Sequence, residues 1–292
     1  MNSSDNTVSV VILTWNRRDD LTETLEKLSH DAYPNLEIIV VDNASTDGTA
    51  EFVADRFPHV KLIQEESNRG IAGYNSGFRS AKGEFIVAID SDSYPHKDAI
   101  SKSVEIFHQY EDVGIVAFDV HTPTELSLAS ENPAPSMEEV TGYHGAGVAF
   151  RREVFEKVGY WYEPFFLYFN EMDHALRSVK AGFKIVRTPD IRAFHKSSVV
   201  SRPSENGPYY YVRNALWVVW RNYPLFPMIF ATLKIIYMAV AESVYQGTSI
   251  YMKAVIDGFR NGGEVFDERR PLSTETFNNS RIPLNLAFSR WG

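Results

Sequence analysis

The sequence predicts an α/β fold, in which a mostly parallel sheet is flanked by helices and followed by a C-terminal helical extension. Over residues 8–118, short apolar runs rich in β-branched residues alternate with segments of helical periodicity, the pattern of strand–helix–strand units. From Tyr209 onward the composition shifts to aromatic and apolar segments that are expected to be helical. Ligands of such sheets bind beyond the carboxyl ends of the strands, so polar residues at those ends are the first candidates for a site.

The strands and helices of the first part are predicted in alternating order. The strands are expected at Val8–Leu13, Leu36–Val41, Lys61–Gln64, Phe85–Ile89 and Gly114–Phe118. The helices are expected at Arg17–His30, Ala50–Phe57, Ile71–Ala81 and Asp98–Tyr110. The first helix rests on Leu21, Leu25 and Leu28, whose spacings of four and three place them on one face. The second begins after N-capping chemistry at residues 45–49.

After Asp119 this alternation stops. Residues 120–140 are polar and contain three prolines, which predicts a loop near the site. The elements expected beyond it are a strand at Tyr143–Phe150, a helix at Arg152–Val158, a helix at Glu171–Ala181 that Gly182 ends, a strand at Lys184–Arg187, and a polar loop that contains His195.

Composition narrows the classes of function. A length of 292 residues allows one large core, or one core with a smaller unit attached. The net charge of −9 argues against a nucleic-acid binder held by phosphate contacts. The absence of cysteine excludes disulfides, zinc–thiolate sites and thiol nucleophiles. The N-terminal residues lack the basic and then apolar pattern of an export signal, so a cytoplasmic protein is expected.

The stretch at residues 83–93, GEFIVAIDSDS, carries the clearest chemical signal. A buried strand closes on Asp90 and Asp92, with Ser91 between them. Two carboxylates held this close repel each other unless a cation or hydrogen-bond donors lie between them. Mg²⁺ and Mn²⁺ take oxygen ligands of this kind and share them with substrate phosphates. The alternative is a solvated acidic turn after a strand. Other motifs in the chain are needed to distinguish this turn from a metal site.

Five segments together resemble a known family. They are VSVVILTWNR, IIVVDNASTDGT, NRGIAGYNSG, FIVAIDSDS and RREVFEKVGYWYEPFFLYFNEMDHALRSVKAGFKI, in this order between residues 8 and 200. The third has glycine spacing and a position that do not fit a dinucleotide-binding loop. The chain resembles the inverting glycosyltransferases of family two, which have the nucleotide-sugar-binding fold called GT-A. The donor would be a nucleotide-diphosphate sugar, used with Mn²⁺ or Mg²⁺.

The resemblance implies roles for residues along the strand ends. Thr14, Trp15 and Asp42 would hold the nucleoside, and Asn68, Gly73 and Asn75 would line the donor cleft. Residues Asp90, Ser91 and Asp92 match the family's Asp-X-Asp motif, with Asp92 as metal ligand and Asp90, a second candidate ligand, nearer the ribose. His195 matches a downstream histidine that helps the metal or the diphosphate; the alternative for His195 is a purely structural role.

The general base is expected at the start of the helix near residue 171. The family carries Glu-Asp-X-Asp there, whereas this chain has Asn170-Glu171-Met172-Asp173. Aligned directly, Glu171 takes the place of the base and Asp173 the second acidic position. Inversion needs one such base to deprotonate the acceptor hydroxyl. The alternative is that Glu171 only favours the helix N-terminus.

The C-terminal part is predicted to be a second region, with a catalytic domain at residues 1–205 and a helical region at residues 206–292. Leu225–Val244 is strongly apolar, but Lys234 and Glu242 interrupt it, so the sequence predicts a helix that does not span a membrane. Such a helix lies on a membrane surface, forms a homodimer contact or packs on the catalytic domain. The segment YYYVRNALWVVWRNYP resembles rhamnosyltransferase-type members, which build bacterial surface polysaccharides on glycan or lipid-linked acceptors. That implies a peripheral position at the inner face of the cell membrane.

Two other functions fit parts of the sequence. A nucleotidyltransferase would carry a glycine-rich basic loop directly after the first strand, and Thr14–Arg17 contains no glycine. A non-catalytic relative that binds a nucleotide sugar, or that acts as a scaffold, is suggested by the altered Asn170-Glu171 pair. The sequence favours an inverting, metal-dependent glycosyltransferase that transfers a hexosyl or rhamnosyl group.

Overall fold

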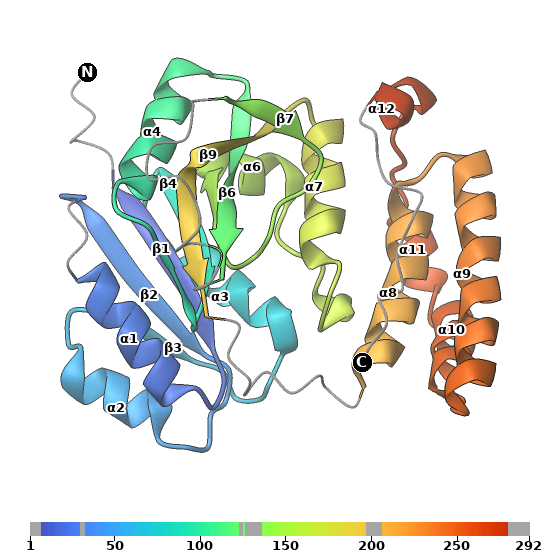
Figure 1. Ribbon diagram of the computed structural model, residues 1–292, viewed down its shortest axis with the longest axis horizontal. Helices are drawn as coiled ribbons and strands as arrows, with labels where there is room; N and C mark the ends of the chain where they lie inside the picture. Colours follow the sequence, from blue (N-terminus) through green and yellow to red (C-terminus); the bar gives the residue numbers. More distant parts are fainter. Residues whose placement is uncertain (1–6, 30–32, 123–124, 126–135, 197–205, 280–292) are drawn as a thin grey trace.

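The computed structural model describes residues 7–29, 33–122, 125, 136–196 and 206–279. A sheet with helices on both faces forms the larger part, and a layer of C-terminal helices stands against one side of it (Figure 1). Helix α7 (Asn170–Lys180) lies between the sheet and these C-terminal helices. The predicted class, an α/β sheet flanked by helices with a helical extension, is confirmed.

The sheet contains nine strands in the order β3-β2-β1-β4-β8-β6-β9-β5, with β7 paired to β9. The strands are β1 Val8–Thr14, β2 Leu36–Asp42, β3 Lys61–Gln64, β4 Phe85–Asp90, β5 Ser93–Pro95, β6 Val113–His121, β7 Glu138–Val140, β8 Val148–Arg151 and β9 Lys184–His195. Strand β1 runs parallel to β2 and β4, with Thr14 opposite Asp42 and Leu13 opposite Asp90. This register brings three of the predicted site residues to one edge of the sheet.

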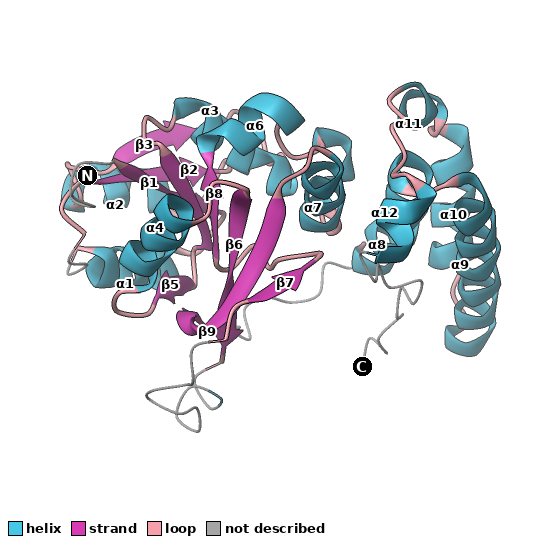
Figure 2. Ribbon diagram, turned by 90° about the horizontal axis from the view of Figure 1, so that it is seen from above, coloured by secondary structure: helices cyan, strands magenta, loops and turns pink. Residues whose placement is uncertain are grey.

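Helices cover both faces of the sheet because its strands are apolar on both sides. Val8, Val10 and Ile12 point into one core, with residues of α1 (Arg18–Leu28), α2 (Thr49–Arg56) and α4 (Ala99–Gln109). Val11 points into the other core, with residues of α3 (Tyr74–Ser80), α6 (Arg152–Val158) and α7. Figure 2 shows α1 and α4 on the opposite side of the sheet from α3 and α6. Two short 3₁₀ helices, η1 (Gly70–Gly73) and η2 (Glu163–Phe165), complete this part.

Three expectations for the middle of the chain are corrected. Strand β9 continues to His195 instead of ending at Arg187, because a bulge against β6 absorbs residues 188–191 and pairing resumes at Arg192. The expected strand at Tyr143–Phe150 shortens to β8, which runs antiparallel to both β4 and β6. The expected loop at 120–140 contributes its ends to β6 and β7, while residues 123–124 and 126–135 lie outside the described part.

The C-terminal helices share a core with α7. They are α8 Gly207–Asn222, α9 Leu225–Gln246, α10 Ile250–Arg260, α11 Gly263–Asp267 and α12 Thr274–Asn279. One cluster of buried side chains contains Leu176 of α7 and Phe165 of η2 together with Leu216 of α8 and Ala254 of α10. The predicted boundary at residues 205 and 206 borders residues 197–205, which are outside the described part, as are residues 280–292.

Helix α9 forms the outer surface of this layer (Figures 1 and 2). Only Ala231, Ile235 and Ala239 are fully buried along its 22 residues. Contrary to the expectation drawn from Lys234 and Glu242, the helix is long and apolar enough to cross a membrane, and 17% of its apolar window is buried. Its exposed apolar side chains include Phe226, Phe230, Leu233, Tyr237, Val244 and Tyr245.

Candidate active site

The Asp-Ser-Asp turn after β4 is held by hydrogen bonds from both sides. Thr24 of α1 donates its hydroxyl to the Ser91 carbonyl at 3.0 Å and is 3.2 Å from the Ser93 carbonyl. The Ser93 hydroxyl donates back to the Asp90 carbonyl at 3.1 Å. The chain therefore bends sharply after β4, and Asp90 and Asp92 are directed to the same side.

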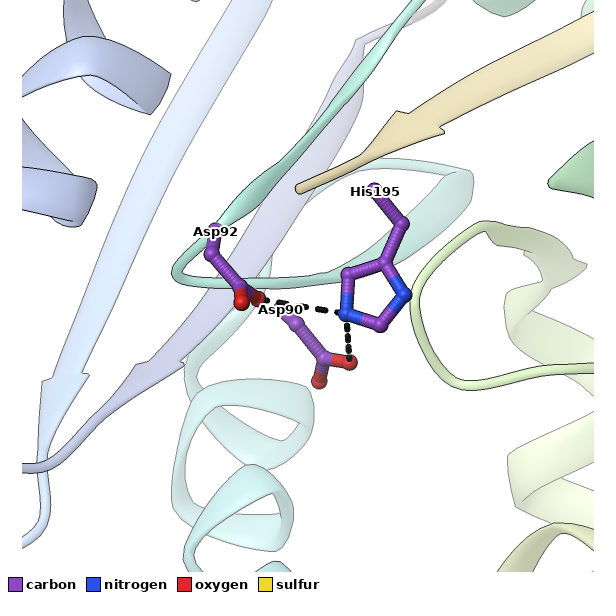
Figure 3. A group of neighbouring side chains, drawn as sticks. All are labelled: Asp90, Asp92 and His195. Atoms are coloured by element: carbon purple, nitrogen blue, oxygen red, sulfur yellow. Dashed lines mark ion pairs between the residues drawn. The ribbon is translucent and has the colours of Figure 1, made fainter. Parts of the chain in front are cut away.

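The two carboxylates meet His195 at the end of β9 (Figure 3). His195 Nε2 lies 3.3 Å from Asp92 Oδ1 and 3.9 Å from Asp90 Oδ2. The antiparallel pairing of His195 with Ser93 of β5 produces this approach. The hydrogen bond to Asp92 and the charges of both carboxylates raise the pKa of His195, and its Nε2 points to where the two carboxylates converge.

These residues fit a divalent cation by the chemistry and spacing of their donor atoms. One ligand atom from each of Asp90, Asp92 and His195 lies within 4.8 Å of the others. Two carboxylate oxygens and an imidazole nitrogen suit Mn²⁺, and the carboxylates also suit Mg²⁺. The second oxygen of Asp92 accepts a hydrogen bond from Arg17 at 2.7 Å, while Tyr74 lies 3.0 Å from Asp90 Oδ1. Both ligands are thus oriented by neighbours, as metal ligands usually are.

The predicted nucleoside residues lie at the ends of β1 and β2. Thr14 and Asp42 are buried and adjacent, and among the described residues neither Thr14 Oγ1 nor Asp42 Oδ1 has a hydrogen-bond partner. Buried polar atoms in folded proteins are nearly always hydrogen-bonded, so these two are well suited to a polar ligand. The Trp15 side chain beside them is 52% exposed, which leaves its ring surface accessible.

The residues predicted to line the donor cleft mostly make contacts within the protein. Asn75 is fully buried, and its amide exchanges hydrogen bonds with the backbone of Trp161 at 2.8 and 3.1 Å. Asn68 Oδ1 accepts a hydrogen bond from Asn43 at 3.0 Å. Gly73 packs closely, because a Cβ there would lie 2.6 Å from Leu13 Cδ1 and 3.2 Å from Asn43 Oδ1. Asn43 lies at the strand end after Asp42, where a site is expected, but it was not among the predicted site residues.

The two predicted carboxylates of α7 lie in different surroundings. Glu171 is partly buried and lies against the turn at residues 144–147, just before β8. Its Oε1 is so close to Gly145 that a Cβ on that residue would come within 2.8 Å of it. Burial, aided by the charge of Asp90, raises the pKa of Glu171 to about 7. Glutamate with such a pKa can accept a proton near neutral pH.

Asp173 points away from this side, into the contact with α8. One oxygen accepts hydrogen bonds from Arg221 at 2.9 Å and Asn222 at 2.8 Å, and the other from Arg177 at 2.8 Å. Burial alone would raise the pKa of Asp173, but Arg177 and Arg221 lower it. Asp173 is completely buried, and both of its oxygens are engaged by Arg177, Arg221 and Asn222, an arrangement that anchors the first turn of α7.

His144 is a residue that the sequence analysis missed. Its ring centre lies 5.7 Å from that of His195, and its Nδ1 accepts a hydrogen bond from the Ala146 amide at 3.0 Å. Burial and the nearby His195 lower the pKa of His144, and Asp90 opposes them. No sequence pattern marks this residue, because it reaches the site through the antiparallel strand β8.

Comparisons with known proteins agree with this geometry. A family model described as Glycosyl transferase family 2 matches residues 9–159. The chain is 27% identical over 111 residues to a dolichyl N-acetyl-alpha-D-glucosaminyl phosphate 3-beta-D-2,3-diacetamido-2,3-dideoxy-beta-D-glucuronosyltransferase of Methanococcus voltae, which covers 36% of this chain and 35% of that protein. It is 24% identical over 203 residues to the amylovoran biosynthesis glycosyltransferase AmsB of Erwinia amylovora, covering 62% of this chain and 67% of that protein.

Among solved structures, the fold is similar to the mannosyltransferase PcManGT from Pyrobaculum calidifontis, solved in complex with GDP-Man and Mn²⁺. The TM-score is 0.60 at 23% identity, and the match covers 88% of this chain and 76% of that one. The similarity therefore extends beyond the sheet into the C-terminal helices, because the described residues of the sheet part end at 196 of 292.

Proposed function

Because the chain belongs to glycosyl transferase family 2 and has the GT-A fold, we propose that it transfers a sugar from a nucleotide-diphosphate donor to a hydroxyl group with inversion. The acceptor would be a glycan or a lipid-linked glycan, and the transferred group a hexosyl or rhamnosyl sugar. The convergence of Asp90, Asp92 and His195 beside a glutamate with a raised pKa carries the proposal.

The strand ends provide the groups that would bind the donor. Trp15 offers a ring face to the base, and the unpaired atoms of Thr14 and Asp42 offer hydrogen bonds to the nucleoside. Asp90, Asp92 and His195 would hold the divalent ion. When bound, such an ion offsets the negative charge that builds on a departing diphosphate. A mannosyltransferase of the same fold was solved with GDP-Man and Mn²⁺, which supports both kinds of ligand.

Glu171 would act as the general base. It must take the proton of the acceptor hydroxyl on the face of the sugar opposite the leaving group. Its partial burial keeps the carboxylate poorly solvated, and a pKa of about 7 makes it a better proton acceptor than an ordinary glutamate. Asp173, which has no access to substrate in this arrangement, would support the base by fixing the helix that carries it.

The proposal predicts that the purified protein releases nucleoside diphosphate from a matching nucleotide sugar in the presence of Mn²⁺. The measurement is a screen of UDP-, GDP- and dTDP-sugars by chromatography, with and without chelator, first without acceptor and then with a lipid-linked or glycan acceptor. Slow hydrolysis that accelerates with acceptor is expected. Tight donor binding with no turnover under any condition would instead support a non-catalytic, sugar-nucleotide-binding role.

The exposed face of helix α9 supports the binding of this protein to a membrane surface. None of its exposed positions carries a charge, and Lys234 and Glu242 are only partly exposed. Soluble monomers seldom leave an apolar surface of this kind in water. We propose that this face lies on the cytoplasmic side of a membrane, where a lipid-linked acceptor would also be found.

We expect the wild-type protein to float with phospholipid vesicles, and a variant carrying Phe226→Ser, Tyr237→Ser and Val244→Ser to remain in the dense fractions. These three side chains are 81%, 73% and 79% exposed, so their replacement should not disturb the core. Tyr110→Ser with Met137→Ser, which removes exposed side chains elsewhere, is the control and should float normally. A wild-type protein that ignores vesicles and is dimeric by light scattering would mean that α9 faces a second copy of the chain.

A further inference from the structure

Helix α8 carries two Arg-Asn pairs, Arg213-Asn214 and Arg221-Asn222. They are eight residues apart, which is slightly more than two helical turns, or about 12 Å along the axis. Both pairs contact the segment that contains Glu171. The first binds the loop before it, and the second binds Asp173 two residues after it.

The loop before Glu171 has an unusual backbone. Phe166, Tyr168 and Phe169 have φ values of 62°, 64° and 69°, a region that side chains other than glycine seldom occupy. Such residues persist only where their surroundings hold them in place. A cluster of three directly before the helix of the proposed base therefore needs an external restraint.

The first Arg-Asn pair supplies that restraint. The buried Asn214 amide donates to the carbonyls of Phe165 at 2.9 Å and Tyr168 at 3.2 Å, and also contacts that of Leu167. Arg213 adds hydrogen bonds to the Pro164 and Phe165 carbonyls at 2.8 and 3.0 Å. On its other side the loop is tied to the donor half of the site, where the Ile71 amide donates to the Phe166 carbonyl at 2.7 Å.

The second pair fixes the start of α7 itself. Arg221 and Asn222 both donate to Asp173 Oδ1, and the Arg221 guanidinium lies 3.8 Å from the centre of the Tyr162 ring. A buried ion pair of this kind is costly to break from one side only, because the remaining charge loses its partner. The first turn of α7, with Glu171 on it, is thus held at both ends by one helix.

We propose that the two Arg-Asn pairs of α8 are positioning residues that set the location of Glu171 relative to Asp90 and the Gly145 turn. This inference rests on the proposed function for the role of Glu171. The set of contacts that Arg213, Asn214, Arg221 and Asn222 make with the segment around Glu171, called the clamp below, is a property of the fold. It makes α8 a part of the catalytic apparatus, although α8 belongs to the region that the sequence assigns to membrane or dimer contact.

The main test is Asn214→Asp, which keeps the size of the side chain and removes its donors. We expect a roughly 10- to 100-fold lower kcat, since displacement of a reacting group by about 1 Å can cost that much, with donor KM and Mn²⁺-dependent binding of nucleoside diphosphate nearly unchanged. The decisive comparison is a double-mutant cycle with Glu171→Gln. If Asn214 acts through the base, its replacement should cost little once Glu171 is absent.

Thr232→Val is the matched control, because it removes a hydrogen bond from Trp220 on the α9 side of α8 and should leave kcat unchanged. Arg213→Met, which keeps the apolar stem of a partly exposed side chain, is the milder variant should Asn214→Asp not fold. Hydrogen exchange at residues 163–173 should be faster in the clamp variants than in Thr232→Val. Full kcat in folded clamp variants, or losses that add fully to that of Glu171→Gln, would overturn the inference. If the clamp variants exchange faster but the wild-type protein itself shows no transferase activity, the clamp is upheld and the proposed function is rejected.

Discussion

Replacement of Glu171 by glutamine is expected to lower sugar transfer by roughly 10²- to 10⁴-fold, the usual contribution of a general base. Donor binding should stay within a factor of a few, because the nucleoside and diphosphate contacts lie on the strand ends. In the wild-type protein, transfer should rise with pH through about 7, since the carboxylate must lose its proton before it can accept one from the acceptor. The measurement is the pH profile of kcat/KM with saturating metal.

The same substitution should stabilise the protein. The pKa of Glu171 is about 7 in the folded protein, against about 4.3 in an unfolded chain, so ionisation of Glu171 opposes folding. The gain in folding stability from Glu171→Gln should therefore begin above about pH 4.3 and reach its full size above about pH 7. There it should raise the melting temperature by several degrees. Glu51→Gln, an exposed glutamate in the first turn of α2, is the control and should change neither rate nor stability.

An active Glu171→Gln variant combined with an inactive Asp173→Asn would contradict the assignment of the base. Asp173→Asn alone is not decisive, because it weakens buried ion pairs with Arg177 and Arg221 and so should destabilise the fold. Melting curves separate the two cases, since loss of a base leaves stability intact or raised.

Asp92→Asn is expected to abolish most metal-dependent donor binding. Asp92 is almost fully buried between Arg17 and His195, and the loss of its charge removes the central ligand of the proposed site. Affinity for UDP or GDP in the presence of Mn²⁺ should fall by roughly a hundredfold or more, because removal of mere supporting partners of metal sites already costs 10- to 100-fold. Isothermal calorimetry, with and without the metal, measures this directly.

The control for Asp92→Asn is Asp47→Asn, in the loop after β2. Asp47 Oδ1 accepts a hydrogen bond from the Thr49 amide at 3.1 Å, just before α2, and the amide oxygen of asparagine can accept the same bond. Binding should be unchanged. Equal affinity of the wild-type protein for nucleoside diphosphate in excess chelator would reject the metal site altogether.

The sequence predicted the sheet part well because its signals are local. The strand ending on Asp90 and the helix of Leu21, Leu25 and Leu28 are defined by patterns within a dozen residues. What escaped prediction depends on contacts between distant residues. His144 reaches the site only because β8 pairs antiparallel to β4 and β6.

Asp173 also shows that contacts between distant residues cannot be predicted from a local pattern. Its identity as an acidic residue near the base was evident, but its orientation depends on Arg221 and Asn222, which are 48 and 49 residues away. Asn75 likewise turns inward to the backbone of Trp161, 86 residues along the chain. A motif gives the residue type at a position, whereas the direction of the side chain depends on the packing of the whole fold.

The ion pair between Asp173 and Arg221 has a consequence for the order of folding during synthesis. Chains fold from the N-terminus as they are made, and strands β1 to β4, with Asp90 at the end of β4, are complete within the first 90 residues. Helix α7 has its permanent partners only after residue 222 has been synthesised. The strand ends that carry Thr14, Asp42 and Asp90 can therefore form early, whereas His195 joins the metal site only with β9 and the base remains unplaced until the C-terminal helices arrive. A nascent chain would thus assemble its nucleoside-binding strand ends well before it is able to transfer the sugar.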